Sequence, residues 1–199
     1  MRKSFRIFAV AAVALAATAL TAQAQGAKQF GIVAGVDFAN MSGDDVDNTS
    51  SKTGFVGGFY VAIPIADRVA IEPEVLYASK GFVDSDNSDF KLSNNYIEIP
   101  VLVRYSFSNE GGVYFLAGPA VGFSISCKFS EGSDEADCAG ENGFGLETNT
   151  TFGGVLGLGF QKNRFGLEGR YDFDFGNAFK DNIAAKNNAW EILARIMIK

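Results

Sequence analysis

The chain has 199 residues, of which 47% are hydrophobic, including 19 phenylalanines. This composition is too apolar for a disordered protein, and a chain of this length with four prolines fits one domain better than two. The formal net charge of −6 argues against a nucleic-acid partner.

The first 24 residues have the three parts of a secretory signal peptide. Three cations within the first six residues are followed by an apolar stretch, and small residues precede position 25. The apolar stretch is shorter than the roughly 20 residues that a membrane-spanning helix needs, and no later run is long enough either. We therefore expect a signal peptide at 1–24 and a mature domain at 25–199, whose charge is −9 once the three cations are removed.

Eight segments of the remaining chain alternate between apolar residues and small or polar residues. A strand projects successive side chains to opposite sides, so each segment has one continuous apolar face. In chain order the eight apolar faces run over Phe30 to Phe38, Phe55 to Ile65, Val69 to Tyr77, Ile97 to Phe107, Val113 to Phe123, Phe152 to Phe160, Phe165 to Phe175 and Trp190 to Ile198. Eight such strands predict an all-β, eight-stranded antiparallel up-and-down barrel, because closure removes the exposed strand edges.

The connections between these segments alternate in length. The short connections lie at 66–68, 108–112 and 161–164. The long polar connections lie at 39–51, 83–90, 129–145 and 176–188. Short turns at one end and long loops at the other are typical of a transmembrane barrel of the outer membrane. The even number of strands places both termini at the short-turn end, which is the periplasmic side in such proteins.

A soluble carrier of the lipocalin type has the same alternation, with its apolar face turned inward. The second face of the segments helps to choose between the two classes, because at 54–62, 118–122 and 153–159 it is small and nearly uncharged. A water-facing exterior carries many more Lys and Glu residues. We therefore expect the apolar faces to contact outer-membrane lipid, and the soluble carrier of small ligands is the alternative.

Four of the segments carry charged side chains on the face opposite the lipid, and together these side chains include both signs of charge. These predicted lumen residues are Glu72, Glu74, Glu98, Arg104, Glu168, Arg170, Asp172, Glu191 and Arg195. The bore of an eight-stranded barrel is just wide enough for side chains to fill, so we expect ion-paired networks without an open channel.

An enzyme that uses lumen or rim carboxylates is a further alternative. Glu72, Glu74 and Glu98 could supply an acid/base pair. The chain has no histidine, which removes Ser-His-Asp, Cys-His and other His-based mechanisms. We favour pairing of these three glutamates with the lumen arginines, and we expect no catalytic residue and no cofactor.

All four prolines lie within the predicted strands, at Pro64, Pro73, Pro100 and Pro119. A proline removes a hydrogen bond from the ladder between strands. We therefore expect bulges or local kinks at some of these positions.

Cys127 and Cys138 are the only cysteines, and they flank ten residues of the longest loop. In an oxidising compartment we expect them to form a disulfide, which contributes on the order of 3 kcal/mol in the chain-entropy model. Free thiols are the alternative. A zinc site is not expected, because the chain offers no histidine and no further cysteine as a ligand.

The long loops hold twelve of the 23 acidic residues, and we expect them to face an extracellular or envelope partner. Asp84, Asp86 and Asp89 are spaced in part like the oxygen ligands of a calcium-binding loop. The turn glycine and the closing glutamate of such a loop are missing, so a solvated loop is favoured. The calcium-binding loop is kept as the weaker hypothesis.

Five stretches resemble outer-membrane β-barrel domain proteins that are grouped with PorT-like proteins. These stretches read GIVAGVDFANMSG, GGFYVAIPIADRVAIEPEVLYASKGF, NNYIEIPVLVRYSF, VYFLAGPAVGF and FGGVLGLGFQKNRFGLEGRYDF. Their arrangement is similar to that of the small OmpX and OmpA barrels. The resemblance implies an integral barrel in a Gram-negative outer membrane and implies no reaction. We therefore expect a porin-like, monomeric, non-enzymatic barrel with a structural or surface-interaction role.

Overall fold

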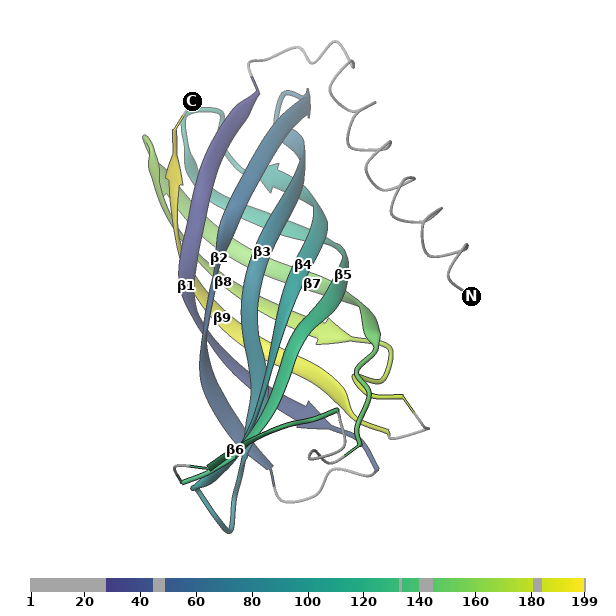
Figure 1. Cartoon of the computed structure of the whole chain (residues 1–199). Coiled ribbons are helices and arrows are strands. Elements are labelled where there is room, and N and C mark those ends of the chain that lie inside the picture. The colour runs from purple at the N-terminus through teal and green to yellow at the C-terminus, as the bar shows by residue number, and fades with distance from the viewer. Residues whose placement is uncertain (1–27, 45–48, 133, 140–144, 181–183, 199) are drawn as a thin grey trace.

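The computed structural model describes residues 28–44, 49–132, 134–139, 145–180 and 184–198, and the predicted signal peptide lies outside them. Within these residues no helix has the length and apolar character needed to cross a membrane. The described strands are β1 (Gln29–Ser42), β2 (Thr49–Ala66), β3 (Val69–Asp84), β4 (Phe90–Ser106), β5 (Gly112–Glu131), β6 (Asp134–Asp137), β7 (Thr150–Lys162), β8 (Phe165–Asp174) and β9 (Lys186–Met197) (Figure 1).

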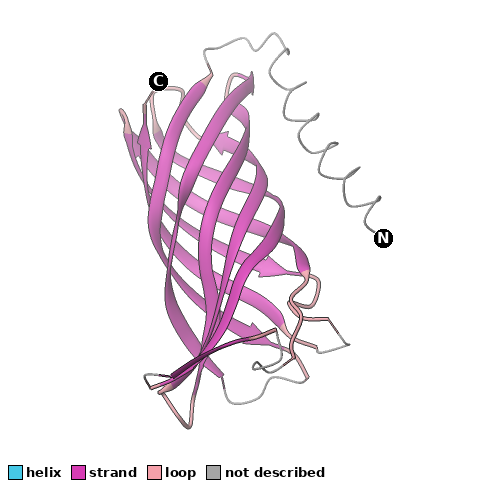
Figure 2. Ribbon diagram, in the orientation of Figure 1, coloured by secondary structure: helices cyan, strands magenta, loops and turns pink. Residues whose placement is uncertain are grey.

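Eight of these described strands close into one antiparallel barrel (Figure 2). Strands adjacent in the chain pair from β1 to β5, β5 pairs with β7, and the series continues through β8 to β9. The barrel closes where β9 pairs with β1. The short strand β6 pairs with the end of β5 and lies at the end of the molecule opposite the C-terminus (Figure 1). The predicted eight-stranded all-β barrel is confirmed.

The side chains alternate across the barrel wall. On β4, Val101 and Val103 are 43% and 50% exposed, whereas Leu102 between them is fully buried. On β9, Trp190 and Ile192 are exposed on either side of buried Glu191. A continuous apolar exterior around a charged interior is stable in lipid and not in water. The soluble carrier, which requires the opposite arrangement, is therefore excluded.

The wall departs from the expected regularity near one proline. Ile63 was expected to face outward, yet it is 4% exposed and lies beside a register shift between Pro64 and Ala66. Proline has no N–H group to give to the ladder, so the pairing is disturbed at this position. Through the other three prolines the pairing keeps its register.

The strands extend farther beyond the apolar band than the sequence predicts. β5 continues to Glu131, and the connection between β3 and β4 is reduced to residues 85–89. The segment expected to be one polar loop at 129–145 contains β6, whose sequence DEAD has no alternation that would predict a strand. At the opposite end the turns are short, and Asn163 adopts a positive φ of 55° in the turn between β7 and β8.

Candidate functional site

The middle of the barrel lumen is occupied by Arg170, which projects from β8. Its Nη1 and Nη2 each donate a 2.7 Å hydrogen bond to one oxygen of Glu74 on β3. Its Nε donates to Glu168. The interaction of a guanidinium group with a carboxylate through two parallel hydrogen bonds is strong and geometrically specific. This contact links strands that are not neighbours in the barrel wall.

Two further arginines extend these contacts toward the periplasmic end. Arg195 donates to Glu168 Oε2 at 2.6 Å and to Glu72 Oε1 at 2.5 Å. Arg104 Nη1 lies 3.5 Å from Glu72 Oε2, and Arg104 Nη2 donates a hydrogen bond to Gln161 Oε1 at 2.5 Å. Three guanidinium groups therefore meet three carboxylates. We call this set the arginine network, and its members are Glu72, Glu74, Arg104, Glu168, Arg170 and Arg195.

Two tyrosines cover the arginine network, and sequence reasoning missed both. The guanidinium carbon of Arg104 lies 3.8 Å from the ring centre of Tyr114, and that of Arg195 lies 3.9 Å from the ring centre of Tyr60. Such cation–π contacts are strongest where water is excluded. A Cβ at Gly159 would lie 2.2 Å from Tyr114 Cζ, so this glycine makes room for the ring.

Nearer the extracellular end, the lumen holds a second charged group. Lys80 Nζ lies 2.5 Å from Glu98 Oε1 and 3.2 Å from Asp172 Oδ2. Glu98, Asp172 and Glu191 each bring a carboxylate oxygen to a common point, where the three oxygens lie within 4.8 Å of one another. All four residues are buried. We call Lys80, Glu98, Asp172 and Glu191 the acidic chamber.

The structure places all nine predicted lumen residues on the inner face, and it divides them between these two groups. The expected pairing of Glu98 with an arginine is wrong, because its ion-pair partner is Lys80. Lys80 was missed because the third apolar face was taken to end at Tyr77. The alternation that places Glu72 and Glu74 inside reaches residue 80 when it is continued in steps of two.

The extracellular mouth of the barrel is covered by a cluster of buried apolar residues. We call this cluster the cap, and its members are Met41, Leu92, Cys138, Ala178, Phe179 and Ala185. They come from β1, from β4 and from the segments before β7 and β9, so they pack across the mouth. Backbone hydrogen bonds from Leu146 to Cys138 and from Ala178 to Ala185, both 2.7 Å, hold these segments together.

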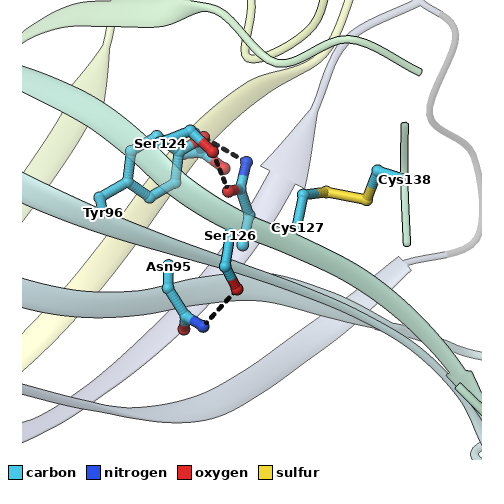
Figure 3. Close-up of a disulfide and its surroundings, with 8 residues drawn as sticks. Asn95, Tyr96, Ser124, Ser126, Cys127 and Cys138 are labelled. Atoms are coloured by element: carbon cyan, nitrogen blue, oxygen red, sulfur yellow. Dashed lines mark hydrogen bonds between the residues drawn. A yellow bond between two sulfur atoms is a disulfide. The ribbon is translucent and has the colours of Figure 1, made fainter. Parts of the chain in front are cut away.

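A disulfide between Cys127 and Cys138 attaches the chain after β6 to the end of β5, with 5.3 Å between the Cα atoms (Figure 3). In the same region Asn95 Nδ2 donates a 3.1 Å hydrogen bond to Ser126 Oγ. Because Cys138 is also a member of the cap, the bond connects the β5–β6 hairpin to the covering of the mouth.

The three aspartates of the predicted calcium-binding loop lie in and after the end of β3. Asp84 Oδ1 accepts hydrogen bonds from the backbone N–H groups of Asp86 at 2.8 Å and Asn87 at 2.9 Å. Asn87 in turn accepts one from the N–H group of Asp89 at 3.2 Å. These are side-chain-capped turns, in which Asp84 Oδ1 and the Asn87 side chain accept backbone N–H groups. The calcium-binding loop stays a prediction.

Two exposed ion pairs lie outside the membrane-spanning part of the barrel. Lys128 on β5 donates to Glu135 on β6 at 2.8 Å, and this contact raises the pKa of Lys128. Lys180 donates to Glu147, which lowers the pKa of the Glu147 carboxyl. The second pair joins the segment before β7 to the segment before β9.

Comparison with known proteins assigns the family. The family model described as outer membrane protein beta-barrel domain matches residues 22–180. The chain belongs to this family. Its location is therefore the outer membrane, as the sequence predicted. The narrower resemblance to PorT-like proteins stays a prediction.

Several solved structures are similar in fold, including Ail and Neisserial surface protein A. Ail, the attachment invasion locus protein of Yersinia pestis, in complex with the heparin analogue sucrose octasulfate, is 16% identical with a TM-score of 0.51, over 87% of this chain and 100% of that chain. Neisserial surface protein A is 13% identical with a TM-score of 0.57, over 86% of this chain and 99% of that chain. No curated protein matches the chain. At these identities the likeness concerns the fold alone.

Proposed function

We propose that this outer-membrane barrel is a monomeric, non-catalytic protein with a closed lumen, and that its extracellular segments carry its interactions. The observation that supports the proposal most is the position of Arg170. Its guanidinium group and the carboxylates of Glu74 and Glu168 are removed from solvent in the middle of the bore. A solute would have to break this paired network in order to pass, and separating a buried pair is costly.

The same burial argues against an enzyme that works inside the lumen. Glu72 and Glu74 are 0% and 1% exposed and are held by arginines. Glu98 is buried in the acidic chamber with Lys80 as its partner. A general acid or base must lie within hydrogen-bond reach of a bound substrate, and none of these carboxylates is open to one.

The extracellular end favours a role in surface interaction. The β5–β6 hairpin projects beyond the barrel, and its residues Asp134, Glu135 and Asp137 are exposed (Figure 1). The cap and the disulfide give this acidic hairpin a fixed base. A preorganised loop loses less conformational entropy on binding than a mobile one. In this proposal the signal peptide at 1–24 is removed before the barrel inserts, and the identity of the partner is left open.

Ion conductance across a planar lipid bilayer tests the closed lumen. The purified protein is expected to insert without opening steps of conductance. A double variant, Glu74→Ala with Arg170→Ala, removes the central pair together and is expected to conduct, because water can then replace two large side chains. Steady conductance by the unchanged protein would contradict the closed lumen. Sedimentation in detergent measures the oligomeric state, and a dimer would contradict the proposed monomer.

A further inference from the structure

The two charged groups of the lumen differ in their balance of charge. The arginine network has three cations and three anions. The acidic chamber has three carboxylates and one ammonium group, which gives a formal charge of −2. Arg170, which lies opposite Glu191 in the β8–β9 pairing, already binds Glu74 and Glu168. Arg170 therefore does not compensate the negative charge of the acidic chamber through a hydrogen bond.

Unpartnered oxygen atoms lie at the acidic chamber. Among the described residues, Glu98 Oε2 and Glu191 Oε1 are buried without a hydrogen-bond partner. Beside them, Asp37 is 0% exposed, and neither of its carboxylate oxygens has a hydrogen-bond partner within the described chain. Asp37 lies opposite Glu191 in the β1–β9 pairing, and the charges of Lys80, Lys52 and Asp172 act on it. Buried polar groups of this kind are normally satisfied by a partner that is a protein atom, a water or an ion.

We propose that the acidic chamber binds one calcium ion through the carboxylates of Glu98, Asp172 and Glu191. A doubly charged cation offsets the formal charge of −2 that these three carboxylates and Lys80 leave, beside which the buried Asp37 is a further carboxylate. Calcium takes six to eight oxygen ligands at about 2.3–2.6 Å, and carboxylates can bind it through both oxygens. Three oxygens within 4.8 Å of one another fit around such an ion, because 4.8 Å is about twice a Ca–O distance.

The enclosure of the chamber favours calcium over magnesium. Magnesium requires near-octahedral geometry at about 2.0–2.1 Å and retains several waters, whereas calcium accepts an irregular shell of protein oxygens. The chamber lies between the arginine network and the cap, and its walls are buried. The ion would connect β4, β8 and β9, and so stabilise the extracellular half of the barrel. This proposal does not depend on the proposed surface role.

The test measures calcium binding and thermal unfolding of the full protein extracted from outer membranes in detergent. The protein is unfolded in urea and refolded with CaCl2 or with EDTA, so that the cap does not block entry of the ion. Equilibrium dialysis is expected to find one Ca²⁺ per chain. The midpoint of thermal unfolding should rise by about 5–10 °C when the free Ca²⁺ concentration is ~100 times the dissociation constant, because the ion binds the folded state.

Two charge-matched variants identify the site. Glu191→Gln should lose the bound ion and the rise in unfolding temperature, and it should still fold in EDTA because it removes repulsion between buried carboxylates. Asp86→Asn removes the same charge from the exposed loop after β3, and it should keep both properties of the unchanged protein.

Three results would overturn the site. The unchanged protein could bind no calcium and unfold at the same temperature in CaCl2 and EDTA. Asp86→Asn, and not Glu191→Gln, could lose binding, which would place the ion in the loop. Finally, the unfolding temperature could respond to pH and not to calcium, which would show that protons neutralise the chamber.

Discussion

Arg170 on β8 and Glu74 on β3 join opposite sides of the barrel through two hydrogen bonds of 2.7 Å, with both side chains removed from solvent. Along the sheet, β2, β1 and β9 stand between these two strands. The pair therefore connects parts of the wall that no backbone ladder joins directly. Its energetic role follows from burial, because a charge that loses its partner here cannot be solvated by water.

Glu74→Gln should lower the free energy of unfolding by about 3–5 kcal/mol, since it leaves the Arg170 charge buried and incompletely paired. The double variant Glu74→Leu with Arg170→Met should cost less than the single variant, because no charge is then left unpaired. Urea unfolding in micelles measures both, with the single tryptophan, Trp190, as the fluorescence reporter.

The matched control for this experiment is Glu135→Gln, which removes one partner of an exposed ion pair on β6. Its effect should stay within about 1 kcal/mol, the range of surface pairs. Equal losses for Glu74→Gln and Glu135→Gln would show that the central pair has no special energetic role.

Replacing Cys127 and Cys138 with serine should lower the free energy of unfolding by about 3 kcal/mol in the chain-entropy model. The β5–β6 hairpin should also become more sensitive to protease, because the disulfide attaches it to the cap. Addition of a reductant to the unchanged protein should reproduce both effects and should leave the double serine variant unaffected. If reductant changed the variant equally, the effect would have another origin.

The contact between Glu147 and Lys180 should depend on pH. The hydrogen bond from Lys180 lowers the pKa of Glu147 below its ordinary value of 4.5. A carboxyl whose pKa is lower in the folded state stabilises that state fully above its unfolded pKa, and the contribution is lost as the pH falls through the folded value. The contact should therefore persist at neutral pH and be lost below pH 4.5.

A carboxyl NMR titration of Glu147 measures this contact directly. The variant Lys180→Met should move the titration midpoint up toward the ordinary value, because the hydrogen bond and the positive charge are both removed. A midpoint that is the same in both proteins would exclude the proposed cause.

The sequence predicts the barrel wall well and the contacts inside it poorly, and the physical reasons differ. Alternation with a period of two assigns Val101 to one face and Leu102 to the other without knowledge of any partner. Lumen contacts join residues as distant in sequence as Glu74 and Arg170, so they depend on how far successive strands are staggered around the barrel. The sequence of any single segment does not determine that stagger. The partner of Glu98 was therefore predicted wrongly although its face was predicted correctly.

The structure of the extracellular end could be predicted only in part, because it too depends on contacts between segments. Polar composition indicates that the long connections are solvated, yet it does not reveal that β5 continues to Glu131. Beyond the lipid the two faces of a strand no longer need different polarity, so the alternation fades while backbone pairing continues. β6 is stabilised by its ladder with β5, which no pattern in Asp134–Asp137 shows.

The assignment of the two faces of β4 gives the most direct test of the barrel in its membrane. Val101 is 43% exposed and lies within the apolar band, whereas Leu102 is fully buried in the lumen. Val101→Arg should lower the free energy of unfolding by roughly 2–4 kcal/mol, the cost of a cation on the lipid face near the bilayer midplane. Val113→Arg, close to the periplasmic turn at the start of β5, should cost less, because the penalty falls toward the membrane interface.

Spin labels test the two faces of β4 directly, and position 101 should be reached by lipid-soluble quenchers whereas position 102 should be shielded from them. Quenching at 102 and protection at 101 would mean that the strand is displaced by one residue, which would reverse every lumen residue of β4.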